Sequence, residues 1–230
     1  MRSQSLFCLG WRPEIIVYCM KPKKKILEIS SALGAHYKST FSKHGASALG
    51  VDWPSKEGMD LRFSKTLRLM NPCSSDYSVL DVGCGYGAFY EYLLAQNFKG
   101  LYTGIDIVPE LVEEGRRRNP SASFVCGDFL ADEKIPKADF VVCSGILTQK
   151  LNADVVAMEE YARALISKMY LQANRAAVSN FLSEYVDFKS TENFYSNAST
   201  WLEEALKYSR NVVVDHDTPF FEFFLSIHRR

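Results

Sequence analysis

The stretch VLDVGCGYGAF, residues 79–89, places three glycines directly behind an apolar run. Because glycine has no Cβ, Gly83, Gly85 and Gly87 permit a tight turn and let a ligand approach the backbone closely. The helix expected behind them would offer free N–H groups to that ligand. Asp81 precedes the glycines, so an acid is followed by three alternate glycines. A turn without a ligand is the alternative, although one glycine usually suffices for such a turn.

Two more acids lie where predicted strands end. Asp106 closes LYTGIDI, where a carboxylate can accept protons from both hydroxyls of a ribose. Asp128 follows in GDF, where it could equally cap a turn, a position that aspartate favours. Gly83, Gly85 and Ala88 also satisfy the dinucleotide pattern GxGxx[GA], which alone is weak evidence. These residues leave two kinds of nucleotide-like cofactor open.

The elements that must position these residues alternate between strand and helix from residue 77 onward. Strands are predicted over 77–83, 101–107, 122–129, 138–146 and 175–182, and helices over 87–97, 109–119, 154–173 and 198–209. This alternation predicts right-handed crossovers and a parallel sheet covered on both faces. Residues 211–229 predict two further strands joined at DHDTP, so the last strand is antiparallel. Ligands of such sheets bind beyond the carboxyl ends of the strands.

The chain before this core divides into two parts. Residues 1–20 are predicted to be a disordered or artefactual extension, because Met20 and the basic run behind it look like a natural start. The apolar stretch in that extension is interrupted by charged residues and a proline, so it predicts neither a membrane span nor a signal peptide. Residues 21–72 are predicted to form a helical cap or lid, and residues 73–230 the cofactor-binding domain.

The composition narrows the range of partners. The chain has 27 Lys and Arg and 27 Asp and Glu, so no excess of base would attract nucleic acid. The six cysteines, at positions 8, 19, 73, 84, 126 and 143, form no CxxC pair. We therefore expect no metal site and no disulfide framework, but reduced thiols in the cytoplasm. Monomer and homodimer are both left open.

Taken together, residues 77–230 resemble a class I S-adenosylmethionine-dependent methyltransferase. VLDVGCGYG is similar to the first motif of that family, GIDI to its ribose-binding acid, GDF to its adenine-binding acid and the final hairpin to its last two strands. The resemblance implies an α/β, Rossmann-like sheet of seven mostly parallel strands, ordered 3-2-1-4-5-7-6. KHGASALGVDWPSKEGMDLRF also resembles the N-terminal region of a small, poorly characterised bacterial subgroup.

The same resemblance implies which residues hold the cofactor. Asp81 would reach the amino group of its methionine part, Asp106 would hold the ribose, and Asp128 would accept from the adenine amino group. Ser144 would lie beside the transferable methyl group, and Arg62 is a candidate for the cofactor carboxylate or an acidic acceptor. The full set is Arg62, Asp81, Gly83, Cys84, Gly85, Gly87, Asp106, Ile107, Asp128, Phe129 and Ser144.

Candidates for the acceptor side come from two aromatic segments and from the histidines. The pocket candidates are Tyr37, Trp53, Tyr185, Phe194 and Tyr195. Helical packing is the alternative for the first two, and the last three lie in a polar loop of the kind that often carries specificity. No catalytic residue is identified, and the candidates for a base are His216, His44 and His36. His216 follows a strand that should be parallel, although a solvated turn explains it as well.

The implied activity is transfer of a methyl group from S-adenosylmethionine to an O or N acceptor, with S-adenosylhomocysteine as product. In-line displacement mainly requires that the acceptor lone pair be aligned with the bond between sulfur and the methyl carbon. A general base is needed only where the acceptor must lose a proton. The fourth predicted strand ends in SGIL, which lacks the Pro-Pro-Tyr and Pro-Cys motifs of enzymes that methylate adenine or glutamine amines and cytosine C5. A small-molecule acceptor is therefore expected. The alternatives are a protein side chain as acceptor, a non-catalytic cofactor-binding subunit, and an NAD-dependent oxidoreductase.

Overall fold

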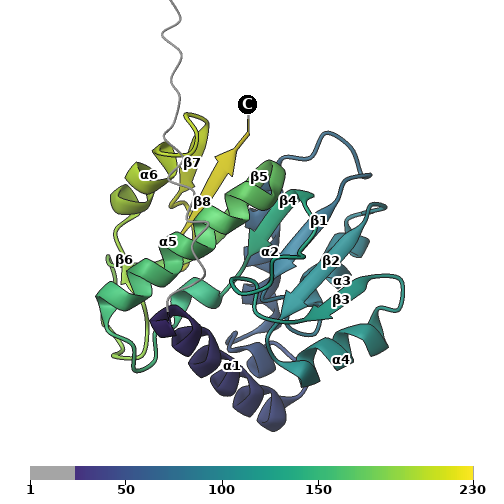
Figure 1. Cartoon of the computed structure of the whole chain (residues 1–230), viewed down its shortest axis with the longest axis horizontal. Coiled ribbons are helices and arrows are strands. Elements are labelled where there is room, and N and C mark those ends of the chain that lie inside the picture. The colour runs from purple at the N-terminus through teal and green to yellow at the C-terminus, as the bar shows by residue number, and fades with distance from the viewer. Residues whose placement is uncertain (1–23, 230) are drawn as a thin grey trace, which may run out of the picture.

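The computed structural model describes residues 24–229 as a single twisted sheet with helices on both faces (Figure 1). The predicted extension 1–20 lies outside the described residues. The strands are β1 (Val79–Val82), β2 (Tyr102–Asp106), β3 (Ser123–Cys126), β4 (Ala138–Cys143), β5 (Ala173–Ser183), β6 (Tyr195–Ser196), β7 (Val212–Asp215) and β8 (Glu222–His228). The helices are α1 (Lys24–His44), α2 (Lys56–Met70), α3 (Ala88–Ala95), α4 (Pro109–Arg118), α5 (Val155–Gln172) and α6 (Ala198–Leu206), with single 3₁₀ turns at Leu49–Val51 and Ile146–Thr148.

The strand order confirms the predicted fold. The sheet runs β3-β2-β1-β4-β5-β8-β7, and β8 is antiparallel to both of its neighbours while the other pairs are parallel. The one difference is β6, a strand of two residues that pairs with β5 at its end. Two residues carry no periodicity, so no sequence pattern could indicate this strand.

Local capping explains where several helices begin. The Ser55 side chain accepts the Gly58 N–H at 3.0 Å before α2, and Asp154 accepts the Ala157 N–H at 2.8 Å before α5. Each side chain satisfies one of the N–H groups that the first turn of a helix leaves unpaired. Pro109 occupies the first position of α4, where its missing N–H costs nothing.

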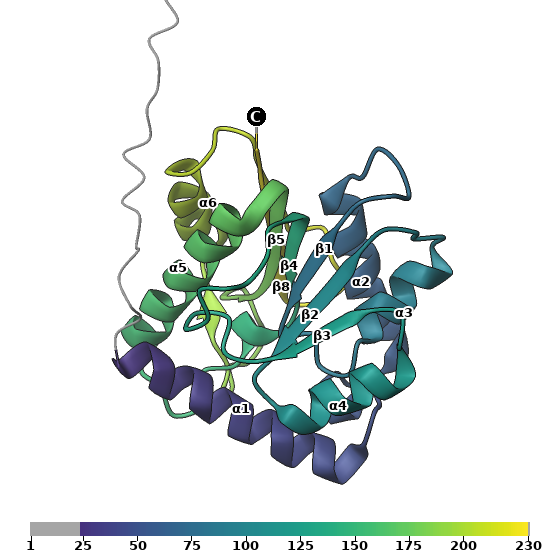
Figure 2. The same cartoon turned by 45° about the vertical axis from the view of Figure 1, so that its right-hand side comes forward.

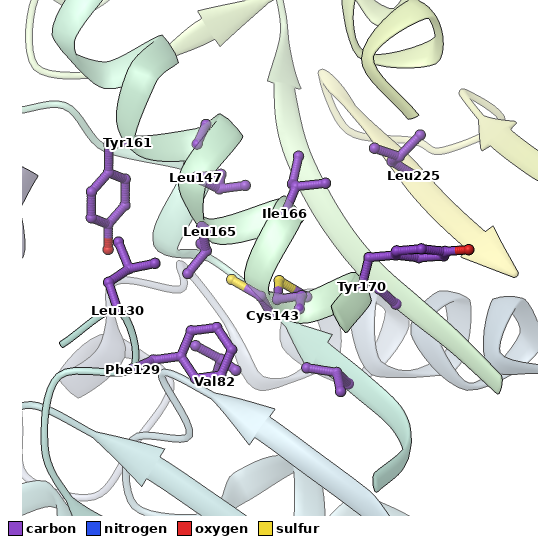
Figure 3. Packing of buried hydrophobic residues seen from close by; sticks show 14 of the residues in the cluster. Val82, Phe129, Leu130, Cys143, Leu147, Tyr161, Leu165, Ile166, Tyr170 and Leu225 are labelled. Atoms are coloured by element: carbon purple, nitrogen blue, oxygen red, sulfur yellow. The ribbon is translucent and has the colours of Figure 1, made fainter. Parts of the chain in front are cut away.

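Alternate residues of the strands build two hydrophobic layers. Leu80 and Val82 of β1 face the layer under α5 and α6, whereas Val79 faces the layer under α2 and α3. Figure 3 shows Leu165 and Ile166 of α5 among the buried side chains of the first layer. Both faces of the sheet are therefore buried, as parallel strands require.

Helix α1 lies across the carboxyl edge of the sheet, between α5 and α4 (Figure 2). Its first half contributes Ile26, Ile29 and Leu33 to the layer under α5. Two exposed ion pairs lie near its ends: Lys25 Nζ is 2.8 Å from an oxygen of Asp154, and Lys38 Nζ is 2.5 Å from an oxygen of Glu110.

Midway along α1, Gly34 lets the helix approach the loop after β2. A Cβ at this position would lie 2.9 Å from Cγ2 of Ile107. The helix backbone therefore packs directly on Ile107, at the edge where ligands of parallel sheets bind.

The layer under α5 and α6 gives the first prediction. Phe181 is fully buried and stacks on Trp201, with ring centroids 4.7 Å apart. Phe181→Ala should lower the free energy of unfolding by about 3–5 kcal/mol, because the lost ring leaves a cavity. Phe188→Ala is the matched control, since that ring is 77% exposed, and should change it by less than about 0.5 kcal/mol. Urea denaturation measures the free energy of unfolding of both variants. If the two substitutions lowered it equally, the layer under α5 and α6 would not be well packed.

Candidate functional site

A cavity of about 1010 Å³, part of it open to solvent, lies at the carboxyl ends of β1, β2 and β4 beneath α1. Eleven of the sequence-predicted residues line it together. They are Tyr37, Trp53, Asp81, Gly83, Cys84, Gly85, Asp106, Ile107, Asp128, Phe129 and Ser144.

The first two glycines of the loop after β1 are required by both conformation and space. Gly83 and Gly85 have φ of 72° and 56°, in the left-handed region that favours glycine. A Cβ on Gly83 would lie 2.5 Å from Cδ1 of Ile146, and one on Gly85 would lie 3.3 Å from Cγ1 of Val51. These two apolar side chains also line the cavity, so they close over the glycine loop.

Gly87 has a structural place rather than a place in the cavity wall. It precedes α3 with φ of 86°, and a Cβ there would lie 2.7 Å from Cζ of Phe124. The third glycine therefore lets the start of α3 pack against β3.

Asp81 is buried at the end of β1 and accepts a hydrogen bond from the Tyr102 hydroxyl, 2.5 Å from its Oδ2. Burial raises the pKa of Asp81 to about 7, the Tyr102 hydrogen bond opposes this shift, and the negative charge of Asp106 adds to it. Sequence reasoning missed Tyr102, which begins β2 and reaches Asp81 only because the two strands are neighbours.

Asp106 connects three parts of the site. Its Oδ2 accepts the Gly85 N–H at 2.8 Å, and its Oδ1 accepts the Val108 N–H at 2.9 Å. Burial raises the pKa of Asp106, while these backbone hydrogen bonds oppose that rise. Because a carboxylate oxygen can accept two hydrogen bonds, both oxygens keep capacity for the hydroxyls of a ligand.

Asp128 follows β3, where it both caps a turn and lines the cavity. Its Oδ1 accepts the Leu130 N–H at 2.8 Å, which is the turn-capping alternative, and the residue also lines the cavity. Phe129 beside it is buried, and the Lys168 Nζ lies 5.1 Å from the centre of its ring.

At the end of β4, Ser144 and Gly145 form the cavity wall next to Trp53. The Ser144 hydroxyl is buried without a hydrogen-bond partner among residues 24–229. Gly145 has φ of 101°, and a Cβ there would lie 3.0 Å from Cζ2 of Trp53. The Gly145 N–H donates to Oδ1 of Asn180 at 2.9 Å. A buried hydroxyl without a partner costs free energy, so Ser144 is poised to bind a ligand.

Arg62 does not line the cavity, and its charge is already paired. Its Nε donates to both carboxylate oxygens of Glu222 at 2.9 and 3.1 Å, and the Asn180 amide donates to the same carboxylate at 3.0 Å. The guanidinium lies between the rings of Trp53 and Phe220, at 4.2 and 3.8 Å from their centres. The structure therefore places Arg62 in a buried ion pair instead of at the predicted cofactor carboxylate.

The three histidine candidates also lie outside the cavity lining. His36 pairs with Asp52, His44 is exposed at the end of α1, and His216 Nε2 lies 2.9 Å from Oγ of Ser183. The strand before His216 is parallel to β5, as expected, so this residue does lie at the carboxyl edge.

Three aromatic candidates from the loop after β5 are likewise not brought to the cavity. Phe194 is buried in the hydrophobic layer under α5, and Tyr185 is exposed. The Tyr195 hydroxyl accepts hydrogen bonds from the Ser190 N–H and the Asn193 amide at 3.0 and 3.2 Å. This loop forms its own local structure.

Two polar residues that the sequence did not indicate line the cavity from helices. They are Ser30 of α1 and Tyr161 of α5. Their spacing within amphipathic helices predicts core positions, so no sequence signal distinguished them. Burial raises the pKa of Tyr161 and of Tyr37 well above neutral pH, so both hydroxyls stay protonated.

The raised pKa of Asp81 predicts a pH-dependent stability. The unfolded carboxyl releases its proton near pH 3.8 and the folded one near pH 7, so folding loses stability as pH rises through this window. Between pH 5 and pH 8 this loss should be about 3 kcal/mol, and Asp81→Asn should remove it while the amide oxygen still accepts from Tyr102. Urea denaturation of the ligand-free protein at pH 5 and pH 8 measures this. If the free energy of unfolding changed equally with pH in the unmodified protein and in Asp81→Asn, the raised pKa of Asp81 would be contradicted.

Within residues 24–229, no group of three or more His, Cys, Asp or Glu residues could hold a metal ion. No helix in the described part of the chain is long and apolar enough to cross a membrane.

Comparison with known proteins agrees with this geometry. Residues 79–168 match the family model described as a methyltransferase domain. The protein named "Putative methyltransferase Rv1506c" from Mycobacterium tuberculosis is 31% identical over 169 residues, which cover 71% of this chain and 99% of that protein.

Two solved structures share the fold at low sequence identity. Magnesium protoporphyrin IX methyltransferase from Synechocystis PCC 6803 with bound S-adenosylhomocysteine has a TM-score of 0.62 and 17% identity, covering 90% of this chain and 99% of that one. N-methyltransferase NodS from Bradyrhizobium japonicum WM9 with the same compound has a TM-score of 0.61 and 16% identity, covering 87% and 98%. With the likeness to the mycobacterial protein over nearly its whole length, the chain belongs to the class I methyltransferase family.

Proposed function

We propose that this protein transfers a methyl group from S-adenosylmethionine to a small molecule and releases S-adenosylhomocysteine. The observation that carries the proposal is the row of three acids, Asp81, Asp106 and Asp128, at the ends of β1, β2 and β3 around one cavity. Membership of the methyltransferase family and the fold shared with proteins that bind S-adenosylhomocysteine support it.

The residues of the cavity fit this cofactor. Asp106 keeps acceptor capacity for the ribose hydroxyls, and Asp128, beside the buried ring of Phe129, can accept from the adenine amino group. Ile107, which packs under Gly34, can cover the adenine ring. The ammonium group of the cofactor would give the buried Asp81 carboxylate a positively charged partner.

When bound, the cofactor supplies a methyl group that its sulfonium already activates. The protein must therefore align the acceptor with the methyl–sulfur bond and keep both reactants in place, which lowers the barrier through proximity and orientation. In the sheet, β4 borders β1 on the side opposite β2, which carries the proposed ribose site. The acceptor would therefore be aligned at the end of β4, where Ser144 and Gly145 lie.

We assign residues 21–72 the role of a lid, of which residues 24–72 are described. Support comes from the position of α1 over the cavity, with Leu33 and Tyr37 in its wall, and from its ion pairs with Asp154 and Glu110. A lid of this kind would keep water away from the reaction.

Several parts of the proposal rest on the sequence alone. A cytoplasmic location and the absence of nucleic acid as a partner stay predictions from the cysteine pattern and the balanced charge. A protein side chain as acceptor and a non-catalytic cofactor-binding subunit remain the alternatives for the role of the cavity.

Calorimetry with S-adenosylhomocysteine, S-adenosylmethionine and NAD tests the cofactor. We expect micromolar binding of the two sulfur compounds, weakened about 100-fold in Asp106→Ala, because hydrogen bonds to a carboxylate contribute about 1.5–3 kcal/mol each. Asp132→Ala is the control on the neighbouring loop and should bind normally. Binding of NAD without either sulfur compound would overturn the cofactor assignment.

The affinity for S-adenosylhomocysteine should depend on pH through Asp81. Its ammonium group requires the ionised carboxylate, so affinity should fall about tenfold per pH unit below pH 7. In Asp81→Asn this dependence should disappear and the affinity should be low at every pH. Isothermal titrations between pH 5 and pH 8 measure it, and a pH-independent affinity of the unmodified protein would rule out this role.

A further inference from the structure

The cavity extends past the acids assigned to the cofactor. Adenosine would occupy the end of the cavity near β2 and β3, where Asp106 and Asp128 lie. The other end of the cavity lies at β4, on the opposite side of β1. There, Trp53 contacts Gly145, and three more apolar side chains complete the wall: Met59, Phe63 and Phe89. We name these four side chains the aromatic wall.

The aromatic wall is suited to a flat apolar body. Phe63 and Phe89 pack with ring centroids 5.2 Å apart, and Trp53 is held in place by Arg62 on its ring. All four side chains are buried, so a ligand beside them is largely removed from water. Polar contact at this end comes from the unpartnered hydroxyl of Ser144.

The charges around the cavity disfavour an anionic acceptor. The carboxyl groups of Asp81, Asp106 and Asp128 belong to the described lining of the cavity, and no Lys, Arg or His is among those lining residues. Arg62 lies behind Trp53, but Glu222 neutralises it through a buried bidentate ion pair. No cationic side chain of the described lining would therefore pair with a carboxylate or thiolate acceptor, and the sulfonium of the cofactor would be its one positive neighbour.

Proton transfer disfavours a hydroxyl acceptor. Attack by a hydroxyl oxygen requires a base, and the three carboxyl groups of the lining are assigned to the ammonium group, the ribose and the adenine of the cofactor. The hydroxyls of Tyr37 and Tyr161 stay protonated, so neither can serve as the base. An uncharged nitrogen needs no base in the transfer step.

We propose that the acceptor is a weakly basic nitrogen, such as an arylamine, on a flat apolar frame that packs against the aromatic wall. The proposal rests on the proposed methyltransferase function. The nitrogen lone pair forms a bond to the methyl carbon as the carbon–sulfur bond breaks and its electron pair returns to sulfur. The positive charge thus moves from sulfur to nitrogen beside the aromatic faces of the wall, and the product ammonium later gives its proton to water.

Three probes with one frame test this inference: 1-aminonaphthalene, 1-naphthol and 1-naphthoate, titrated into protein saturated with S-adenosylhomocysteine. We expect the amine to bind and the carboxylate to bind at least tenfold more weakly. With S-adenosylmethionine carrying a labelled methyl group, label should appear on the amine and on neither oxygen compound. Equal or tighter binding of the carboxylate, transfer to oxygen, or no binding of any probe would overturn the proposal.

Two variants locate the effect. Trp53→Ala should weaken binding of the amine about tenfold and Trp53→Phe should retain most of it, while both still bind S-adenosylhomocysteine. Glu222→Gln leaves the charge of Arg62 without its partner, so binding of the carboxylate should improve relative to the amine. Loss of S-adenosylhomocysteine binding by the unmodified protein would instead refute the proposed function, so the two failures are distinguishable.

Discussion

The carboxylate of Asp106 is the contact on which the site depends. It joins the glycine loop after β1 to the end of β2 and to the start of α4 through the N–H groups of Gly85 and Val108. Gly85 lies in the left-handed turn of the loop, so its N–H would otherwise be buried without a partner. One buried acid therefore holds the loop in the shape that the cavity requires.

A second network supports the opposite end of the cavity. Arg62 of α2, Glu222 of β8 and Asn180 of β5 form a continuous set of buried hydrogen bonds that ends at the Gly145 N–H. Each charge has a partner, which makes its burial tolerable, and the planar guanidinium also supports the ring of Trp53. The network thus positions a cavity wall without lending the cavity any charge.

The cavity contains buried polar groups that lack a hydrogen-bonding or charged partner in the free protein. Asp81 and Asp106 are buried acids whose pKa values burial raises, and the Ser144 hydroxyl has no partner in the described part of the chain. Such groups cost stability in the free protein, and a ligand with matching hydrogen bonds and charge recovers that cost. The hydrophobic layers on both sides of the sheet supply the stability that makes this arrangement possible.

The sheet, its crossovers and the residues around the glycine loop could be predicted from the amino-acid sequence, because each is encoded within a short stretch: an apolar run, alternate glycines and an acid at each strand end. The partners of Arg62 and Asp81, the place of Phe194 in the core and the contribution of Tyr161 to the cavity became visible only in the folded molecule. Arg62 and Glu222 are 160 positions apart, and a charged residue's pattern does not indicate which distant residue it will meet. Contacts between elements depend on how the layers pack, and periodicity identifies a buried face without separating core positions from cavity walls.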